Sequence, residues 1–174
     1  PIDSITFMAL SSYSLNNGMG SPVSVNPVEP DYASVVLTLA SNISAGIIYT
    51  LTVNGAKDCA GNQIASDNSV LFGIAEPVSA DDVVINEIMF DPNSDGVEWI
   101  EIYNRSEKVI DLKEIFICSQ DDNGTLKEIN QVAPKGYLLL PQKYLVLSTD
   151  GNAIKAQYNT TNPNGFIDMT SVPS

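Results

Sequence analysis

Residues 83–104 read VVINEIMFDPNSDGVEWIEIYN, and this stretch decides the fold. Apolar residues recur at about every second position in its two ends, 83–90 and 98–104. A period of two is typical of β-strands that turn one face to a core. The middle, 91–96, is rich in residues that form turns. The stretch therefore predicts two antiparallel strands joined by a polar loop.

The second of these strands has two unlike faces. Ile100 and Ile102 share one face, which we predict to point into the core. Trp99, Glu101 and Tyr103 share the opposite face. Two outward aromatic side chains can bind a sugar ring or a protein partner, although they can equally pack under a loop. We take Trp99 and Tyr103 as the candidate binding residues.

The same period of two recurs along the rest of the chain. Short runs rich in β-branched and aromatic residues, separated by turn formers, occur at 34–40, 47–53, 114–120, 136–140 and 144–148. Many short strands at this spacing predict an all-β fold of antiparallel β-sandwiches. Only 152–159 is compatible with a turn or two of helix. A change of composition at 73–82 indicates a boundary between two domains.

The charge balance limits the kinds of partner. Eight lysine and arginine residues stand against 21 acidic residues, which gives a formal net charge of −13. Such a field repels phosphate backbones, so we expect no nucleic-acid partner. The apolar runs are far shorter than the roughly 20 residues that span a bilayer, so we expect no membrane insertion. The chain has no histidine, which removes the commonest general base and transition-metal ligand.

The polar loop offers a candidate metal site. Asp91, Asn93 and Asp95 stand at alternate positions before a glycine, the spacing with which many calcium loops begin. A complete loop of the helix–loop–helix kind needs a glutamate at its twelfth position, where this chain has Ile102. We favour a hairpin turn that holds no cofactor, and a weak calcium site on these three residues is the alternative.

Three glutamates near this loop are candidates for a catalytic pair of carboxylates: Glu87, Glu98 and Glu101. A glycosidase holds two carboxyl groups across a cleft about 5–10 Å wide. Glu98 and Glu101 lie three positions apart on a strand and so point to opposite faces. No insertion that would form a cleft is visible, and without histidine the usual serine triad is excluded. We predict no catalytic residues and no enzyme activity.

The first half of the chain carries one specific motif. Residues 44–64 read SAGIIYTLTVNGAKDCAGNQI, in which 49–53 alternates like a strand and Asp58 supplies the side-chain acceptor of a tight turn. This segment resembles the closing hairpin of bacterial Ig-like domains of the surface-layer type. The resemblance implies an Ig-like domain at 1–77, in which 1–15 forms the second strand and the N-terminal strand is missing.

The second half carries a denser resemblance. Residues 83–124 contain NEI at the end of one strand and EWIEIYNRS in the next, and 136–150 contain PQKYLVLS. These motifs, in this order, resemble the lamin-tail domain, an Ig-like sandwich of nuclear lamins and of many bacterial envelope proteins. The resemblance implies a lamin-tail domain at 83–174 after a linker at 78–82. Family members continue with another strand or two after the segment that matches 165–174, so the resemblance implies a sandwich that could lack its C-terminal strand.

Both resemblances are to modules that usually accompany other domains. We therefore expect two tandem Ig-like antiparallel β-sandwich modules, either of which could be truncated. The expected function is non-catalytic: structural and interaction modules of a larger bacterial cell-surface or secreted protein, extracellular or in the cell envelope, that bind protein or glycan partners. The alternative is a carbohydrate-binding module with structural calcium. If edge strands are missing, neighbouring copies could exchange strands.

Overall fold

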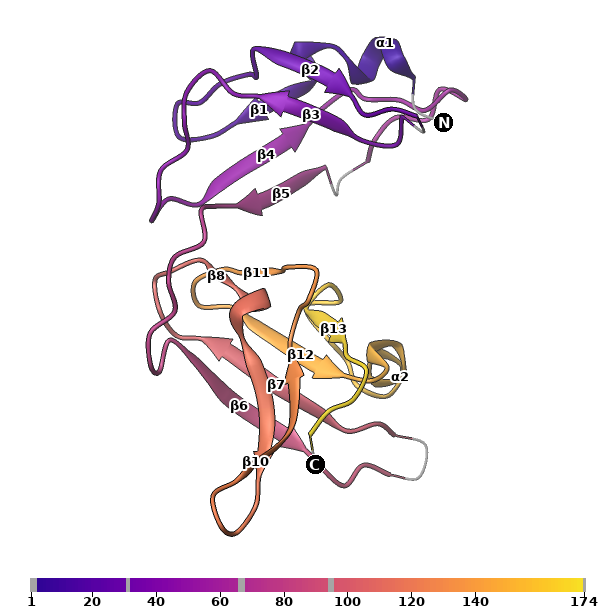
Figure 1. The fold of residues 1–174 in the computed structure, drawn as a ribbon. Coiled ribbons are helices and arrows are strands. Elements are labelled where there is room, and N and C mark those ends of the chain that lie inside the picture. The colour runs from indigo at the N-terminus through magenta and orange to yellow at the C-terminus, as the bar shows by residue number, and fades with distance from the viewer. Residues whose placement is uncertain (1–2, 31, 66–67, 94–95, 174) are drawn as a thin grey trace. The chain divides into compact units, whose positions relative to one another are not determined.

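Most regular structure in the chain is β-strand (Figure 1). The computed structural model describes residues 3–30, 32–65, 68–93 and 96–173. Within these residues the chain forms two compact units that divide after residue 74. The strands pair almost entirely as antiparallel neighbours. The predicted all-β fold is confirmed.

The first unit holds two small antiparallel sheets. One has the order β1–β4–β5, and the other pairs β2 with β3. The strands of this unit are β1 (Tyr13–Leu15), β2 (Ser24–Pro27), β3 (Val35–Thr38), β4 (Tyr49–Val53) and β5 (Ser69–Phe72). Buried apolar side chains come from both sheets, among them those of Tyr13, Val25 and Tyr49.

The start of this unit differs from the prediction. A short helix, α1 (Ser4–Phe7), and a 3-10 helix, η1 (Leu10–Ser12), precede a strand of only three residues. Asp3 explains the helix. Its side-chain Oδ1 accepts the backbone N–H of Ile5 at 3.1 Å, and its backbone carbonyl accepts the N–H of Phe7 at 3.0 Å. Such an acceptor favours a helical turn over extended chain. The prediction of a strand over 1–15 is therefore wrong for 3–12 and holds for Tyr13–Leu15, while residues 1 and 2 lie outside the described residues.

The turn predicted after Asp58 is present. Its Oδ1 accepts the backbone N–H groups of Ala60 at 2.9 Å and Asn62 at 2.8 Å, and its Oδ2 accepts the Asn62 side-chain amide at 2.8 Å. The bonds from Asn62 hold the pKa of the Asp58 carboxyl below its ordinary value. Gly61 takes a φ of 89°, which glycine adopts without steric cost. The acidic side chain thus closes the turn that follows β4.

The second unit is built on a four-stranded sheet with the order β13–β12–β7–β6. Its strands are β6 (Val83–Met89), β7 (Trp99–Asn104), β12 (Tyr144–Ser148) and β13 (Phe166–Asp168). Neighbours are antiparallel except for β12 and β13, which are parallel. The connection between those two contains α2 (Gly151–Gln157), which confirms the predicted turn or two of helix, and Asp150 caps its first turn.

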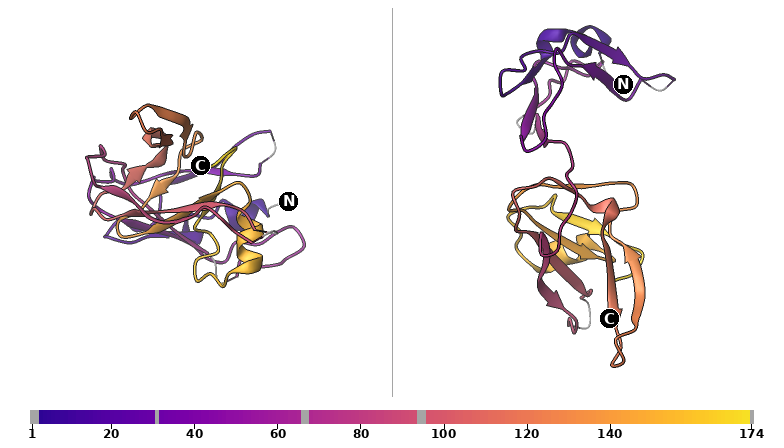
Figure 2. Two further views of the ribbon diagram at one scale, coloured as in Figure 1. Left: turned by 90° about the horizontal axis from the view of Figure 1, so that it is seen from below. Right: turned by 60° about the vertical axis from the view of Figure 1, so that its left-hand side comes forward.

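A second layer covers one face of this sheet (Figures 1 and 2). It consists of a hairpin and a short strand pair: β9 (Phe116–Gln120) with β10 (Leu126–Gln131), and β8 (Ile110–Asp111) with β11 (Leu138–Leu139). The 3-10 helix η2 (Leu112–Glu114) follows β8. Ile117 and Val132 of this layer join Leu145 and Leu147 of the sheet in one apolar cluster. Together the two layers form a sandwich with a single core.

Strands β6 and β7 are the pair predicted from residues 83–104. They run antiparallel, with Met89 opposite Trp99, and a bulge interrupts the register just before Glu87. The side chains of Ile100 and Ile102 are 5% and 4% exposed, so their predicted orientation into the core is confirmed. The opposite face of β7 therefore looks away from the core.

Candidate functional site

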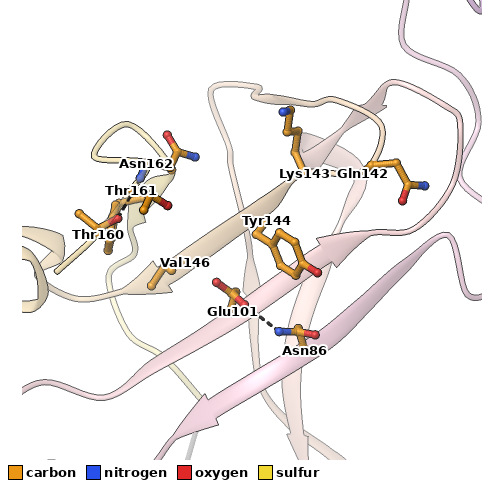
Figure 3. Close-up of a pocket in the computed structure, with 11 residues that line it drawn as sticks. Asn86, Glu101, Gln142, Lys143, Tyr144, Val146, Thr160, Thr161 and Asn162 are labelled. Carbon is orange, nitrogen blue, oxygen red and sulfur yellow. Dashed lines mark hydrogen bonds between the residues drawn. The ribbon is translucent and has the colours of Figure 1, made fainter. Parts of the chain in front are cut away.

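A groove opens on the side of the four-stranded sheet that faces away from the core (Figure 3). It encloses about 720 Å³, within the range of small-molecule sites. We call it the outer-face groove and define it by six of its lining residues: Asn86, Glu101, Tyr144, Val146, Thr160 and Asn162. In Figure 3 the loop that carries Thr160 and Asn162 lies beyond Val146, while Glu101 and Asn86 lie on the other side.

The aromatic element of the groove is a stack of two tyrosines. Tyr144 of β12 lies directly opposite Tyr103 of β7 in the sheet register. Their ring centroids are 4.4 Å apart and the ring planes differ by 21°. Tyr144 lines the groove and is 46% exposed, whereas Tyr103 does not line it. The Tyr144 ring thus lines the groove, and the Tyr103 ring packs against it.

Hydrogen bonds hold this stack in place. The Tyr103 hydroxyl donates to Oε1 of Gln142. The amide of Gln142 in turn donates to the carbonyls of Arg105 at 3.0 Å and Ser106 at 3.3 Å. Gln142 itself has a φ of 57°, an uncommon backbone conformation for a residue other than glycine. Tyr103 is therefore fixed by hydrogen bonds, and Tyr144 is ordered through its stack on that ring, so it would lose little freedom on binding a ligand.

A carboxylate and an amide form the polar side of the groove. The Asn86 side chain donates to Oε1 of Glu101 at 2.8 Å (Figure 3). The bulge in β6 brings about this contact, because it sets an extra residue opposite Glu101. Among the described residues, Oε2 of Glu101 and Oδ1 of Asn86 have no hydrogen-bond partner. Two acceptors thus stand beside an exposed ring.

A tight loop before β13 forms the opposite wall. The Asn162 N–H donates to the Thr160 hydroxyl oxygen at 3.2 Å, and the Asn162 carbonyl accepts the Gly165 N–H at 3.1 Å. The Gly165 carbonyl then accepts the N–H of Val146 at 2.9 Å, which ties the loop to β12. A Cβ at Gly165 would overlap the Asn162 side chain. A larger residue here would have to displace the Asn162 side chain.

The predicted binding residues occupy different places. Tyr103 lies behind Tyr144, as described above. Trp99 lies opposite Met89 and Ser148 in the sheet and does not line the groove. Its indole Nε1 is buried and has no hydrogen-bond partner within the part of the chain that the structure describes. Binding by these two residues stays a prediction, and the groove adds Tyr144, whose position could have been found by pairing the two strands.

The candidate calcium ligands can be placed only in part. Asp91 and Asn93 are exposed, and the Asn93 carbonyl accepts the Gly96 N–H at 2.7 Å. Asp95 lies outside the described residues. In the ranges that are described, no three histidine, cysteine or acidic residues gather as a metal site would require. Calcium binding at this loop stays an open prediction.

No described helix is long and apolar enough to cross a membrane.

The second unit thus has the antiparallel sandwich of an Ig-like domain and, on its outer sheet face, a groove with an exposed aromatic ring. The family model of the Lamin Tail Domain matches residues 76–169, which is more than half of the chain. The chain belongs to the lamin tail domain family, whose domain is Ig-like, structural and non-catalytic. Neither the curated proteins nor the solved structures gave a match. All six groove residues lie within the matched range.

Proposed function

We propose that this chain is a non-catalytic segment of a larger bacterial cell-surface or secreted protein and binds a protein or glycan partner at the outer-face groove. The observation that carries the proposal is the fixed tyrosine stack. Tyr144 is 46% exposed although its ring is held in place by Tyr103. Exposed aromatic surface that is already ordered is typical of recognition sites, because little entropy is lost when a partner covers it.

The first unit would serve as a spacer of the same kind. We propose that it is a bacterial Ig-like domain of the surface-layer type, on the strength of the motif at 44–64. The turn closed by Asp58 and Gly61 supports this assignment, since both residues belong to that motif. Two small β-domains that follow one another in the chain are the arrangement expected of such a spacer. This arrangement suits a protein of the cell envelope.

Co-sedimentation with isolated envelopes tests the proposal. The purified chain is mixed with cell envelopes of one Gram-negative and one Gram-positive bacterium, and the bound fraction is measured. Tyr144→Ala removes the exposed ring of the groove. Tyr137→Ala is the matched control, because Tyr137 is also partly exposed, at 36%, but does not line the groove. We expect binding to at least one envelope, and we expect Tyr144→Ala but not Tyr137→Ala to reduce it.

Two results would contradict the proposal. The chain could fail to bind either envelope, in which case the groove has no partner there. Alternatively, both tyrosine variants could bind as well as the parent chain, in which case binding takes place elsewhere. The Trp99 fluorescence of each variant serves as the folding control, since this is the only tryptophan of the chain and it lies in the same unit.

A further inference from the structure

The exposed ring of Tyr144 determines what kind of surface the ligand must present to it. One face of Tyr144 rests on Tyr103, and Tyr144 lines the groove. A flat apolar surface of similar size can stack there, as the C–H face of a pyranose ring does on aromatic side chains. Val146 extends this apolar strip along β12. The ligand therefore needs an apolar flat face.

The polar side chains of the groove determine which chemical groups the edge of the ligand must carry. Glu101 and Asn86 each keep one acceptor that has no partner among the described residues, on one side of the ring. Thr160 and Asn162 present a hydroxyl and an amide on the other side. Hydroxyl groups can donate to the first pair and can donate to or accept from the second. A ring with hydroxyls around its edge and C–H groups on its face satisfies both requirements.

The strand pairing disfavours a peptide as the ligand. The floor of the groove consists of β7 and β12, which pair with each other. Each also has a second neighbour, β6 and β13 respectively. Their backbone groups are therefore engaged on both sides, and an extended peptide could not add to them as a further strand. The floor offers side chains alone.

The charges disfavour an acidic ligand. Glu101 and Lys143 both line the groove, so it carries one negative and one positive side chain. The chain as a whole has a net charge of −13, which repels anions at longer range. A uronic acid or a sulfated sugar would meet this field without a cluster of basic residues to hold it. The ligand is therefore expected to be uncharged.

From these steps we infer that the outer-face groove binds a neutral oligosaccharide of the gluco configuration, with one ring stacked on Tyr144. The linkage is expected to be β, because the β-glycosidic bond of such a ring is equatorial and keeps its faces flat, whereas an α bond is axial. The equatorial hydroxyls of that configuration leave both faces of the ring apolar and point outward toward Glu101 and Asn162. The inference rests on the proposed function of the groove as a recognition site, and it names the chemical class of the partner.

Isothermal titration of the whole chain with four sugars tests the inference. Cellotetraose and tetra-N-acetylchitotetraose are neutral and β-linked, maltotetraose is neutral and α-linked, and tetragalacturonate is acidic. We expect at least one of the β-linked sugars to bind. Tyr144→Ala should weaken that binding by about tenfold, because the stacked contact is lost. Tyr144→Trp should retain it, and Tyr137→Ala should leave it unchanged.

The outcomes separate the inference from the proposed function. If neither β-linked sugar binds, or if maltotetraose or tetragalacturonate binds as tightly as they do, the inference is overturned. If in addition envelope binding depends on Tyr144 and is destroyed by protease treatment of the envelopes, the partner is a protein and the proposed function stands. If envelope binding is absent as well, both fall. A melting curve followed by Trp99 fluorescence shows that each variant is folded.

Discussion

Replacement of Asn104 by alanine is expected to destabilise the second unit strongly. The side chain lies at the end of β7 and is fully buried, with 0% exposure. Its Nδ2 faces three carbonyls, those of Lys108 at 2.8 Å, Leu139 at 3.0 Å and Leu140 at 3.1 Å. The Asn104 Oδ1 accepts two hydrogen bonds from Ser106, one from its backbone N–H at 3.1 Å and one from its side-chain hydroxyl at 2.7 Å. One side chain thus joins β7 to the segment around β11.

The size of the effect follows from these contacts. The two amide hydrogens and the Oδ1 account for about four hydrogen bonds, each contributing roughly 1 kcal/mol net. Asn104→Ala removes them and leaves buried carbonyls without donors, so we expect a loss of about 3–4 kcal/mol. For a unit of this size, each kcal/mol lowers Tm by roughly 4–8 °C. A loss of 3 kcal/mol therefore corresponds to a decrease of roughly 12–24 °C.

Thermal and urea unfolding followed by tryptophan fluorescence measure this loss. Trp99 is the only tryptophan and belongs to the second unit, so its emission reports that unit without a contribution from the first. Asn152→Ala is the matched control, since Asn152 is exposed in the first turn of α2. Its effect should stay within about 0.5 kcal/mol, as is usual for surface positions.

Asn104→Asp separates the lost hydrogen bonds from the lost volume. The aspartate has nearly the same shape but turns a carboxylate, which cannot donate, toward the carbonyls of Leu139 and Leu140. At neutral pH it should destabilise the unit at least as much as alanine does. If Asn104→Ala costs less than about 1 kcal/mol, or if the aspartate variant is as stable as the parent chain, the role assigned to this amide is refuted.

Three further predictions concern other parts of the molecule. The Lys108 ammonium donates to Asp82 at 2.7 Å and holds the pKa of that carboxyl below its ordinary value. The resulting stabilisation is present above the unfolded pKa and is lost as pH falls through the folded pKa, so the deficit in Tm of Asp82→Asn should shrink toward zero in acid. Gly165→Ala should cost about 1–3 kcal/mol by pushing Asn162 aside, and Asn162→Ala in the same chain should recover part of that loss. Millimolar calcium added after chelation should leave Tm almost unchanged, and a rise of several degrees would show that the loop 91–96 binds the ion.

The strand period was sufficient to predict the centre of the second unit. Ile100 and Ile102 are buried while Glu101 between them faces the groove, because successive side chains of a strand point to opposite faces. The pairing of β6 with β7 followed from the polar loop between two such runs. Both features depend on local sequence, which is why pattern alone could predict them.

Features that depend on distant parts of the chain were missed. The strand β10 is exposed at its first four positions and shows no alternation of apolar residues. Its sequence therefore contains no pattern that would predict its pairing with β9. The strand β13 has three residues and pairs in parallel with β12 across α2. At the start of the chain, the hydrogen bonds of Asp3 favour a helical turn where the resemblance to a bacterial Ig-like domain implied a strand. For both strands a partner outside the segment decided the structure, whereas at the start of the chain a local acceptor did.

The candidate site shows how the core determines the surface. Tyr144 meets Tyr103 because β12 pairs with β7 in the register that also sets Leu145 opposite Ile102. A slip of one residue would turn Tyr144 inward and expose Leu145, which is 1% exposed, so apolar burial forbids it. The groove therefore exists because the core selects this register. Substitutions that loosen the packing of Leu145 should weaken the proposed ligand binding at Tyr144, although Leu145 does not line the groove.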